Sequence, residues 1–169
     1  MIVRMIPLDS LSGRRLVSTV TIVVPVHNAL VETLRCLEAL RNTIGGRARV
    51  LVIDDASTDP EVLPKITEIT QSAGFDLVVN TENLGFVGTC NRAFSIIANG
   101  HVVLLNSDTQ PQAGWLEAML SAVDEDIASI TATSNNASIY SLPFPNIDPF
   151  SADFGPEELA GIVRNVIPP

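Results

Sequence analysis

The sequence has little positive charge. Lys and Arg together number 10 among 169 residues, against 19 Asp and Glu, so the formal net charge is −9. Affinity for a phosphate backbone comes mainly from clustered Lys and Arg. The composition therefore excludes nucleic acid as a partner, and an anionic ligand has to be held by backbone N–H groups, helix N-termini or a metal ion.

Cysteines are few, and long apolar runs are absent. Cys36 and Cys90 are far apart and not in CxxC spacing, which argues against a zinc site and against a disulfide framework. No run reaches the length of a membrane span, and the start of the chain lacks an apolar segment followed by a cleavage site. We expect no membrane span in this chain and a cytoplasmic location, which also allows peripheral attachment of the full-length protein at the inner face of the plasma membrane.

The composition that is present suits one folded domain. Hydrophobic residues make up 46% of the chain and charged residues 17%, so a sizeable core can form. Residues 1–18 show no clear hydrophobic period and are predicted to be a leader or linker. We expect the domain proper over 19–140 and a Pro-rich tail with one short helix over 141–169.

Apolar runs alternate with segments of helical period along the domain. Strands are expected over 19–26, 49–53, 75–79, 101–105 and 127–132, and helices over 30–43, 60–73, 86–98 and 115–123. In the second helix, Asp59 is expected to cap the free N–H groups and Pro60 to take the first helical position. The alternation predicts an α/β fold with a mostly parallel sheet covered by helices on both faces.

Ligands of parallel sheets bind beyond the carboxyl ends of the strands, and polar residues follow each apolar run here. Asp54 and Asp55 follow the second run; taken alone, they read as turn and cap residues. Two adjacent carboxylates are costly unless something binds them, however, so at least one is a candidate ligand group. An Asp at this edge can accept a hydrogen bond from the imide N–H of uracil or thymine, a donor that cytosine lacks.

The segment NLGFVGTCNRA over 83–93 places Gly85 at a turn and then opens a helix. Exposed N–H groups and the helix dipole make such a start receptive to a diphosphate, although the glycines also suit a tight turn and close packing. The spacing is not that of the GxGxxG dinucleotide motif. Arg92 is a candidate for positive charge near the phosphates, or else a solvated helical residue.

The segment Asn106-Ser107-Asp108 follows the fourth apolar run. Asp108 either caps the turn or serves as a hard oxygen ligand for Mg²⁺ or Mn²⁺ that links the protein to a diphosphate. The ring of His27 is placed where a base or ribose can pack against it.

Four segments carry a family resemblance by their order and spacing: VTIVVPVHN, VLVIDDASTD, NTENLGFVGTCNRAF and HVVLLNSDTQPQAGWLEAM. Taken together, they resemble glycosyltransferase family 2, whose members are inverting enzymes with the GT-A fold. The resemblance runs from about Thr19 to Asn136, and NLGFVGTCN and LLNSDT look most like rhamnosyltransferase-type members that act on bacterial surface polysaccharides. It implies a UDP- or dTDP-sugar donor and a glycan or lipid-linked acceptor. It also implies that Pro25 and His27 flank the base, that Asp55 pairs with it, and that Asp108 binds the metal as the end of a DxD motif. The nucleotide site expected as a whole comprises Pro25, His27, Asn28, Asp54, Asp55, Asn83, Gly85, Asn91, Asn106 and Ser107.

Two departures from the family pattern shape the functional hypothesis. The DxD motif reads Asn106-Ser107-Asp108, without its first carboxylate. Family members carry a general base in a downstream, acceptor-binding half, and no tail carboxylate (Asp148, Asp153, Glu157 or Glu158) sits in a matching motif, so the catalytic residue is unassigned. We therefore expect a GT-A domain truncated before the acceptor-binding half, with a nucleotide-sugar-binding module or an inactive fragment of a longer protein as the alternative. A nucleotidyltransferase would carry a Gly-rich, basic loop after the first strand, which PVHNALVE is not.

Overall fold

The computed structural model describes residues 2–5, 19–124 and 126–132. The chain divides into two compact units, residues 1–111 and 112–169. The first unit contains nearly all of the described elements and every residue of the expected nucleotide and metal site.

The first unit is built on a sheet with the strand order β4-β3-β2-β5-β1. The parallel strands are β2 (Val20–Val26), β3 (Arg49–Asp54), β4 (Asp76–Val79) and β5 (Gly100–Leu104), and β1 (Ile2–Met5) pairs antiparallel with β5. The two central strands, β2 and β3, are apolar and almost fully buried, as expected for strands covered on both faces.

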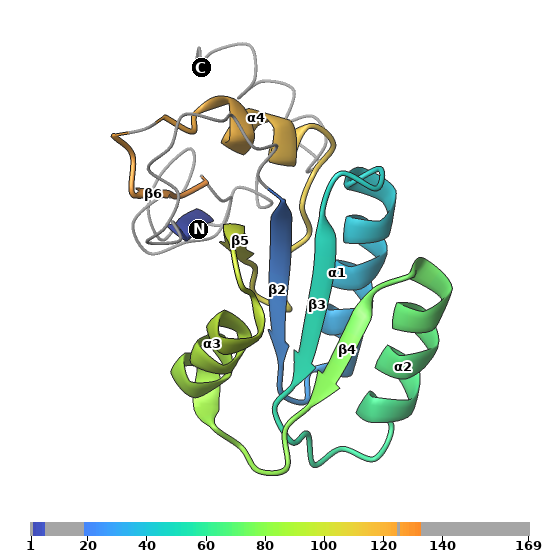
Figure 1. The fold of residues 1–169 in the computed structure, drawn as a ribbon. Coiled ribbons are helices and arrows are strands. Elements are labelled where there is room, and N and C mark those ends of the chain that lie inside the picture. The colour runs from blue at the N-terminus through green and yellow to red at the C-terminus, as the bar shows by residue number, and fades with distance from the viewer. Residues whose placement is uncertain (1, 6–18, 125, 133–169) are drawn as a thin grey trace, which may run out of the picture. The chain divides into compact units, whose positions relative to one another are not determined.

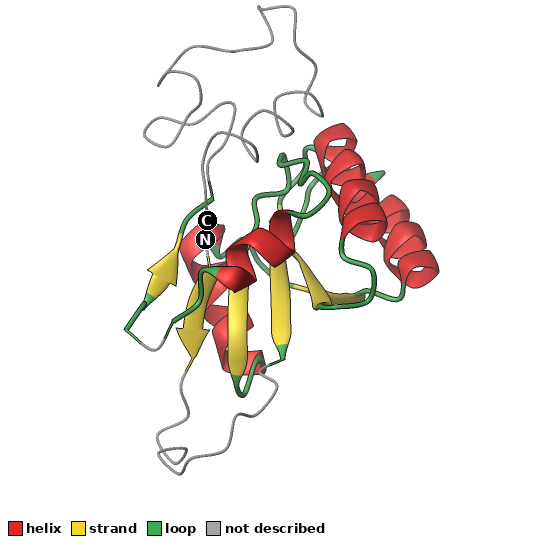
Figure 2. Ribbon diagram, turned by 90° about the horizontal axis from the view of Figure 1, so that it is seen from above, coloured by secondary structure: helices red, strands yellow, loops and turns green. Residues whose placement is uncertain are grey.

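Three helices connect the parallel strands: α1 (Leu30–Thr43), α2 (Val62–Ala73) and α3 (Gly85–Ile96). α1 and α2 lie side by side on one face of the sheet, and α3 lies on the other (Figures 1 and 2). The predicted α/β fold with a mostly parallel sheet and helices on both faces is thus confirmed.

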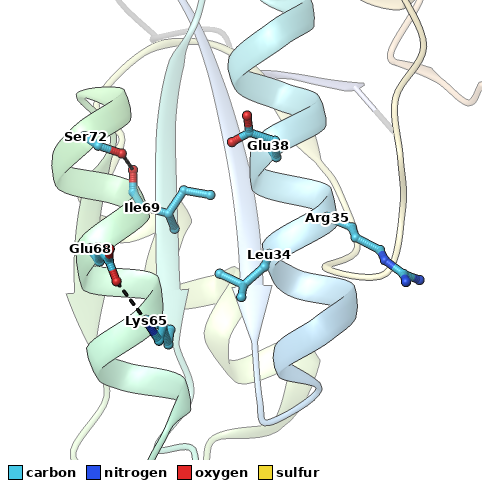
Figure 3. A pocket seen from close by; sticks show the side chains of 7 residues that line it. All are labelled: Leu34, Arg35, Glu38, Lys65, Glu68, Ile69 and Ser72. Carbon is cyan, nitrogen blue, oxygen red and sulfur yellow. Dashed lines mark hydrogen bonds and ion pairs between the residues drawn. The ribbon is translucent and has the colours of Figure 1, made fainter.

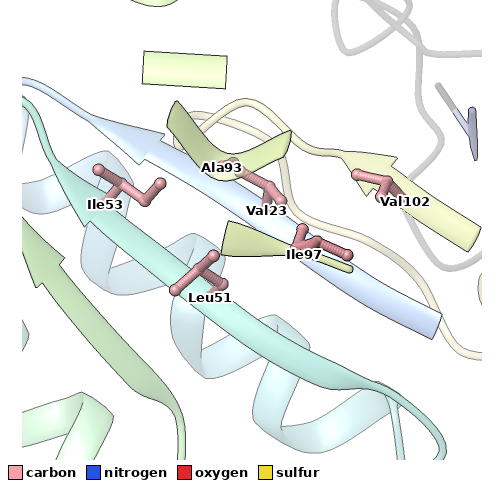
Figure 4. Close-up of a cluster of buried hydrophobic side chains, with 6 residues drawn as sticks. All are labelled: Val23, Leu51, Ile53, Ala93, Ile97 and Val102. Carbon is pink, nitrogen blue, oxygen red and sulfur yellow. The ribbon is translucent and has the colours of Figure 1, made fainter. Parts of the chain in front are cut away.

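Alternate residues of the central strands supply two separate cores. On the face of α3, one buried cluster joins strand residues to helix residues (Figure 4): Val23, Leu51, Ile53, Ala93, Ile97 and Val102. Their strand neighbours Ile22, Val24 and Val52 are fully buried. Because side chains alternate along a strand, these three point to the opposite face, which α1 and α2 cover (Figure 1). This two-sided packing fixes the register of the sheet and thereby the positions of the loops at its carboxyl edge.

The structure differs from the sequence-based expectation at two element boundaries. Ile2–Met5, expected to belong to a leader or linker, forms β1. Helix α2 begins at Val62 rather than at Pro60, because the Asp59 carboxylate accepts from the N–H of Glu61 at 2.9 Å and holds residues 59–61 in a turn. Pro60 therefore lies outside the helix.

The second unit contains α4 (Trp115–Ser121), which buries Leu116 and Met119, and a two-residue strand β6 (Ser129–Ile130), shorter than the expected 127–132. The Pro-rich tail, its expected helix and its four carboxylates lie outside the described residues. Among the described helices, none has the length and apolar character needed to cross a membrane.

Candidate functional site

The loops after β2, β3 and β4 all lie at the carboxyl edge of the sheet, where Figure 1 shows the three arrowheads and the starts of α1, α2 and α3. Parallel pairing produces this arrangement, because it aligns the ends of neighbouring strands. Residues distant in the sequence are therefore brought together here, and hydrogen bonds connect them.

Asp55 is at the centre of this edge, and it is 3% exposed. Its Oδ1 accepts from the side-chain amide of Asn80 at 2.6 Å and from the backbone N–H of Leu84 at 2.9 Å. Burial acts to raise the pKa of the Asp55 carboxyl, but hydrogen bonds, chiefly those from Leu84 and Asn80, outweigh it and lower the pKa below its ordinary value. Asp55 is thus a buried carboxylate that stays ionised.

Asn80 is buried at the end of β4 and links Asp55 to α3. Its Nδ2 also donates to the hydroxyl of Thr89 at 3.1 Å, and its Oδ1 accepts from the Arg92 guanidinium. Arg92 donates in addition to the carbonyl of Val79 at 3.3 Å. Arg92 is therefore neither a purely solvated residue nor, in this structure, directed at a phosphate site; it binds Asn80. Neither Asn80 nor Thr89 was in the expected site, since an Asn after a strand and a Thr in a helix carry no distinctive sequence signal.

His27 and Asn83 lie beside Asp55. His27 Nδ1 is 2.9 Å from the backbone carbonyl of Asp55, so this nitrogen carries the proton and donates. The other ring nitrogen, Nε2, then accepts, and the amide of Asn83 lies 3.2 Å from it. Three of the expected nucleotide-site residues are thus in one hydrogen-bonded group.

Asn28 joins the loop after β2 to the loop after β3. Its backbone N–H donates to Ser57 Oγ at 2.8 Å, and its Oδ1 accepts from the backbone N–H groups of Thr58 at 2.9 Å and Asp59 at 3.0 Å. Ser57 in turn donates to Asp54 Oδ1 at 2.5 Å. Asn28 and the buried Asp54 therefore serve as framework of the edge in this structure.

Backbone strain is concentrated in the same two loops. In the described part of the chain, the non-glycine residues with positive φ are Asn28 (56°), Ala29 (51°) and Ala56 (53°). Such a conformation costs an L-residue roughly 1–2 kcal/mol, and strained backbone clusters at functional sites.

The start of α3 is built from Gly85, which has φ 69°. Its N–H donates to Asn83 Oδ1 at 2.8 Å, so this group is already bound within the protein. Phe86 and Val87 follow in the first turn, where N–H groups have no partner inside a helix, and α3 has no side-chain cap. Both residues are more than half exposed. Any diphosphate at this helix start would meet the N–H groups of Phe86 and Val87 rather than that of Gly85.

The segment Asn106-Ser107-Asp108 follows β5, next to β2 in the sheet. Asn106 O accepts from Thr109 N at 3.1 Å and from the thiol of Cys36 in α1 at 3.6 Å. Burial, and then the charge of Asp108, raise the pKa of Cys36 to about 12, so the thiol stays protonated and able to donate. The charge of Asp108 therefore acts on Cys36, in the middle of α1.

The donor set at this segment suits a hard cation held by few protein ligands. Asp108 is exposed, and Asn106 and Ser107 offer further oxygen atoms. The described residues contain no group of three His, Cys, Asp or Glu side chains that could hold a metal by themselves. A single carboxylate fits Mg²⁺ or Mn²⁺ when phosphate oxygens and water supply the other ligands.

Two of the expected residues have different surroundings. Pro25 is the sixth residue of β2 and lies beyond the last β2–β5 pair, Val23 with Leu104, so its missing N–H costs no bond on that side. Asn91 is exposed on α3, and within the described chain it makes no hydrogen bond to the group around Asp55. The structure does not bring Asn91 into this group.

A groove of about 500 Å³ lies elsewhere, between α1 and α2 (Figure 3). It is lined by Leu34, Arg35, Glu38, Lys65, Glu68, Ile69 and Ser72. The groove shares no residue with the carboxyl edge and holds charges of both signs, so we assign it no role in nucleotide binding.

Comparison with known proteins decides the family. The model of the family described as Glycosyl transferase family 2 matches residues 21–147, which include β2 apart from its first residue, all of β3 to β5 and every residue of the edge described above. The chain belongs to glycosyl transferase family 2. A curated protein of similar sequence is the undecaprenyl-phosphate 4-deoxy-4-formamido-L-arabinose transferase of Klebsiella pneumoniae, 27% identical over 131 residues.

Solved structures of glycosyltransferases share the fold. The mannosyltransferase PcManGT of Pyrobaculum calidifontis, in complex with GDP-Man and Mn²⁺, superposes with a TM-score of 0.52 at 24% identity over 61% of this chain. Residues 1–349 of S. aureus TarS superpose with a TM-score of 0.53 at 21% identity, and TarS has also been solved with UDP-GlcNAc.

These proteins are longer than the chain. The sequence match to the Klebsiella transferase covers 73% of this chain and 40% of that protein. The structural match to the mannosyltransferase covers 31% of that protein. The chain therefore spans less than half the length of these proteins.

Proposed function

We propose that this chain binds a nucleoside diphosphate sugar, with uracil or thymine as the base, at the carboxyl edge of its sheet. The reaction proposed for the enzyme is metal-assisted, inverting transfer of the sugar, of hexosyl or rhamnosyl type, to a hydroxyl of a glycan or lipid-linked acceptor. This would place it in the synthesis of polysaccharide or cell-surface glycan. Complexes of structural neighbours with GDP-Man and UDP-GlcNAc support a nucleotide-sugar ligand.

The observation that carries the proposal is the fixed, ionised carboxylate of Asp55. Both hydrogen bonds from Asn80 and Leu84 end on Oδ1. Oδ2 is the atom that we assign to the ligand, where it would accept from the imide N–H of a pyrimidine base. The exposed ring of His27 beside it supplies a flat surface for the base or ribose.

Asp108 is the residue proposed to hold the cation, with Asn106 and Ser107 beside it. A bound Mg²⁺ or Mn²⁺ would neutralise charge on the diphosphate leaving group. On the protein side, the free N–H groups at the start of α3 would contribute donors to the same diphosphate. The complex of the Pyrobaculum mannosyltransferase with Mn²⁺ and GDP-Man supports a divalent cation here.

The second candidate function is a nucleotide-sugar-binding module without turnover. The side chains described at the carboxyl edge favour this candidate. They form contacts suited to a donor nucleotide, and we assign none of them as the general base that an acceptor hydroxyl needs. A transfer assay with the purified chain separates the two candidates. We expect this chain to bind donor nucleotide and to hydrolyse the sugar slowly at most.

Calorimetric titration tests donor binding directly. UDP, dTDP, CDP and GDP are titrated into the protein with Mn²⁺, with Mg²⁺ and with EDTA. The proposal expects UDP or dTDP to bind more tightly than CDP, and EDTA to weaken binding. Tighter binding of GDP or CDP than of both UDP and dTDP would contradict the pyrimidine assignment.

Matched Asp to Asn variants assign metal binding and base recognition to single residues. Asp108→Asn should abolish the dependence on metal, and Asp55→Asn should reduce the preference for UDP over CDP. Asp76→Asn is the control, because Asp76 is half-exposed in an ion pair with Arg49 where β4 begins, away from the carboxyl edge. Equal effects of all three variants would point to a general loss of charge instead.

A further inference from the structure

We propose that Arg92 and Asn80 are positioning residues for the base-reading carboxylate, with Arg92 orienting the Asn80 amide and Asn80 fixing Asp55. This inference rests on the proposed function, in which Asp55 reads the base. Its structural basis is the set of hydrogen bonds that join α3, the end of β4 and the loop after β3. Arg92 touches neither of the atoms assigned to the ligand, so it acts through Asn80.

The chemistry of the three groups permits one orientation of the Asn80 side chain. A guanidinium only donates hydrogen bonds, so the end of the amide that faces Arg92 is the oxygen. An ionised carboxylate only accepts, so the end that faces Asp55 at 2.6 Å is the NH₂ group. The two neighbours require the same orientation, and the hydroxyl of Thr89, at 3.1 Å from Nδ2, is compatible with it.

Burial makes this arrangement stiff. Asn80 is 3% exposed, Asp55 3% and Thr89 is fully buried, so water does not compete freely for these bonds. The N–H of Leu84 fixes the same Oδ1 from a second direction. With Oδ1 held twice, rotation of the carboxylate is restricted and Oδ2 keeps one direction. Binding of a base then requires little reordering of the side chain.

Arg92 also places positive charge behind the carboxylate without contacting it. Among the described residues, ionisable groups near Asp55 include its neighbour Asp54, which accepts from Ser57, and His27, which donates to the Asp55 backbone carbonyl. Polarisation along Arg92, Asn80 and Asp55 strengthens each bond of the series. Loss of Arg92 should therefore weaken the contact between Asn80 and Asp55 even though Arg92 does not touch Asp55.

The test is a double-mutant cycle with two readouts. The variants are Asn80→Ala, Arg92→Met and the double variant, with Asn99→Ala and Arg41→Met as controls at exposed positions outside the edge. The first readout is an NMR titration of the Asp55 carboxyl carbon in the protein without ligand. The second is the ratio of UDP affinity to CDP affinity in the presence of Mn²⁺. Circular dichroism establishes that each variant is folded.

We call the action of Arg92 on Asp55 through Asn80 the relay. It predicts that the effects of the two substitutions are not additive in the double-mutant cycle. Each single variant should raise the titration midpoint of Asp55, and the double variant should match Asn80→Ala. The preference for UDP over CDP should fall about tenfold in Asn80→Ala, the scale of one lost charge-assisted bond. The controls should behave as the wild type.

Two results would overturn the relay. One is an Asp55 midpoint that Arg92→Met leaves unchanged. The other is an Arg92→Met effect that persists in full when Asn80 is already Ala, because charge would then act through space. A wild type that does not bind UDP contradicts the proposed function instead, and the Asp55 titration still decides the relay. Should Asn80→Ala fail to fold, Asn80→Ser provides the smaller change, with the same expected direction.

Discussion

The backbone N–H of Asn28 donates a 2.8 Å hydrogen bond to the hydroxyl of Ser57, and this contact ties the loop after β2 to the loop after β3. The Asn28 side chain reinforces the link by accepting from two N–H groups of the second loop. Both loops carry strained backbone, and both surround Asp55. Their connection is therefore a structural requirement of the proposed base site.

Asn28→Ala should destabilise the protein by about 1–3 kcal/mol, because two N–H groups lose their acceptor. Asn28→Asp keeps an oxygen at the same place and should lose less. Urea unfolding monitored by circular dichroism provides both values. Equal losses in the two variants would show that the acceptor atom is not what stabilises the loops.

Ala56→Gly should stabilise the protein by about 0.5–1 kcal/mol. Ala56 has φ 53°, a conformation that costs an L-residue roughly 1–2 kcal/mol and glycine almost nothing. Glycine loses more backbone entropy on folding, which offsets roughly 0.5–1 kcal/mol of this gain. Thermal unfolding measures the difference. A lower melting temperature for Ala56→Gly would mean that the strain is smaller than the entropy term.

Gly88→Ala tests the packing at the start of α3. A methyl group at Gly88 would lie 2.8 Å from Leu84 Cβ, so Leu84 must move, and its N–H is the one bound to Asp55. Overpacking costs typically 1–3 kcal/mol, whereas the helix propensity of Ala recovers about 1 kcal/mol. We expect a net destabilisation of up to about 2 kcal/mol together with weaker UDP binding, measured by unfolding and calorimetry. A stabilised variant with unchanged UDP affinity would contradict the close contact.

The contribution of Asp55 to stability should depend on pH. Its pKa is lowered in the folded state, so ionised Asp55 stabilises the fold above the ordinary carboxyl range, and this stabilisation is lost as the pH falls through the folded-state pKa. Asp55→Asn should be less stable than the wild type at neutral pH by about 1.5–3 kcal/mol. Unfolding curves for both proteins from neutral to acid pH should converge at the acid end. A difference that stays constant over this range would show that Asp55 does not titrate differently in the two states.

Most of the sheet could be predicted from the sequence, because buried parallel strands read as apolar runs and the polar residues after them share one edge. β3 ends in Asp54, and the position of Asp55 beyond it follows from this pattern. The strand over Ile2–Met5 was not predicted, because four residues that include an Arg show no hydrophobic period that distinguishes a strand from a linker. The first helix, 30–43, was predicted with its observed bounds, since its apolar stripe is long.

The detailed contacts of the site could not be predicted in the same way. Gly85 was expected at a turn and among the nucleotide-binding residues, but the partner of its N–H, the Asn83 side chain two residues earlier, could not be predicted. The partner of Arg92 is Asn80, and only the packing of α3 against the sheet brings these two together. Such contacts depend on the distance between elements, which hydrophobic periodicity does not specify.

Binding of UDP and of its N3-methyl derivative tests the central claim most directly, since methylation removes the imide N–H and leaves the ribose and diphosphate unchanged. If Asp55 accepts from that N–H, methylation should weaken binding to the wild type at least about tenfold, the scale of one hydrogen bond to a charged group. The loss should be much smaller for Asp55→Asn. Equal affinity of the wild type for UDP and N3-methyl-UDP, with Mn²⁺ present in both titrations, would contradict the assignment of Asp55 as the residue that reads the base.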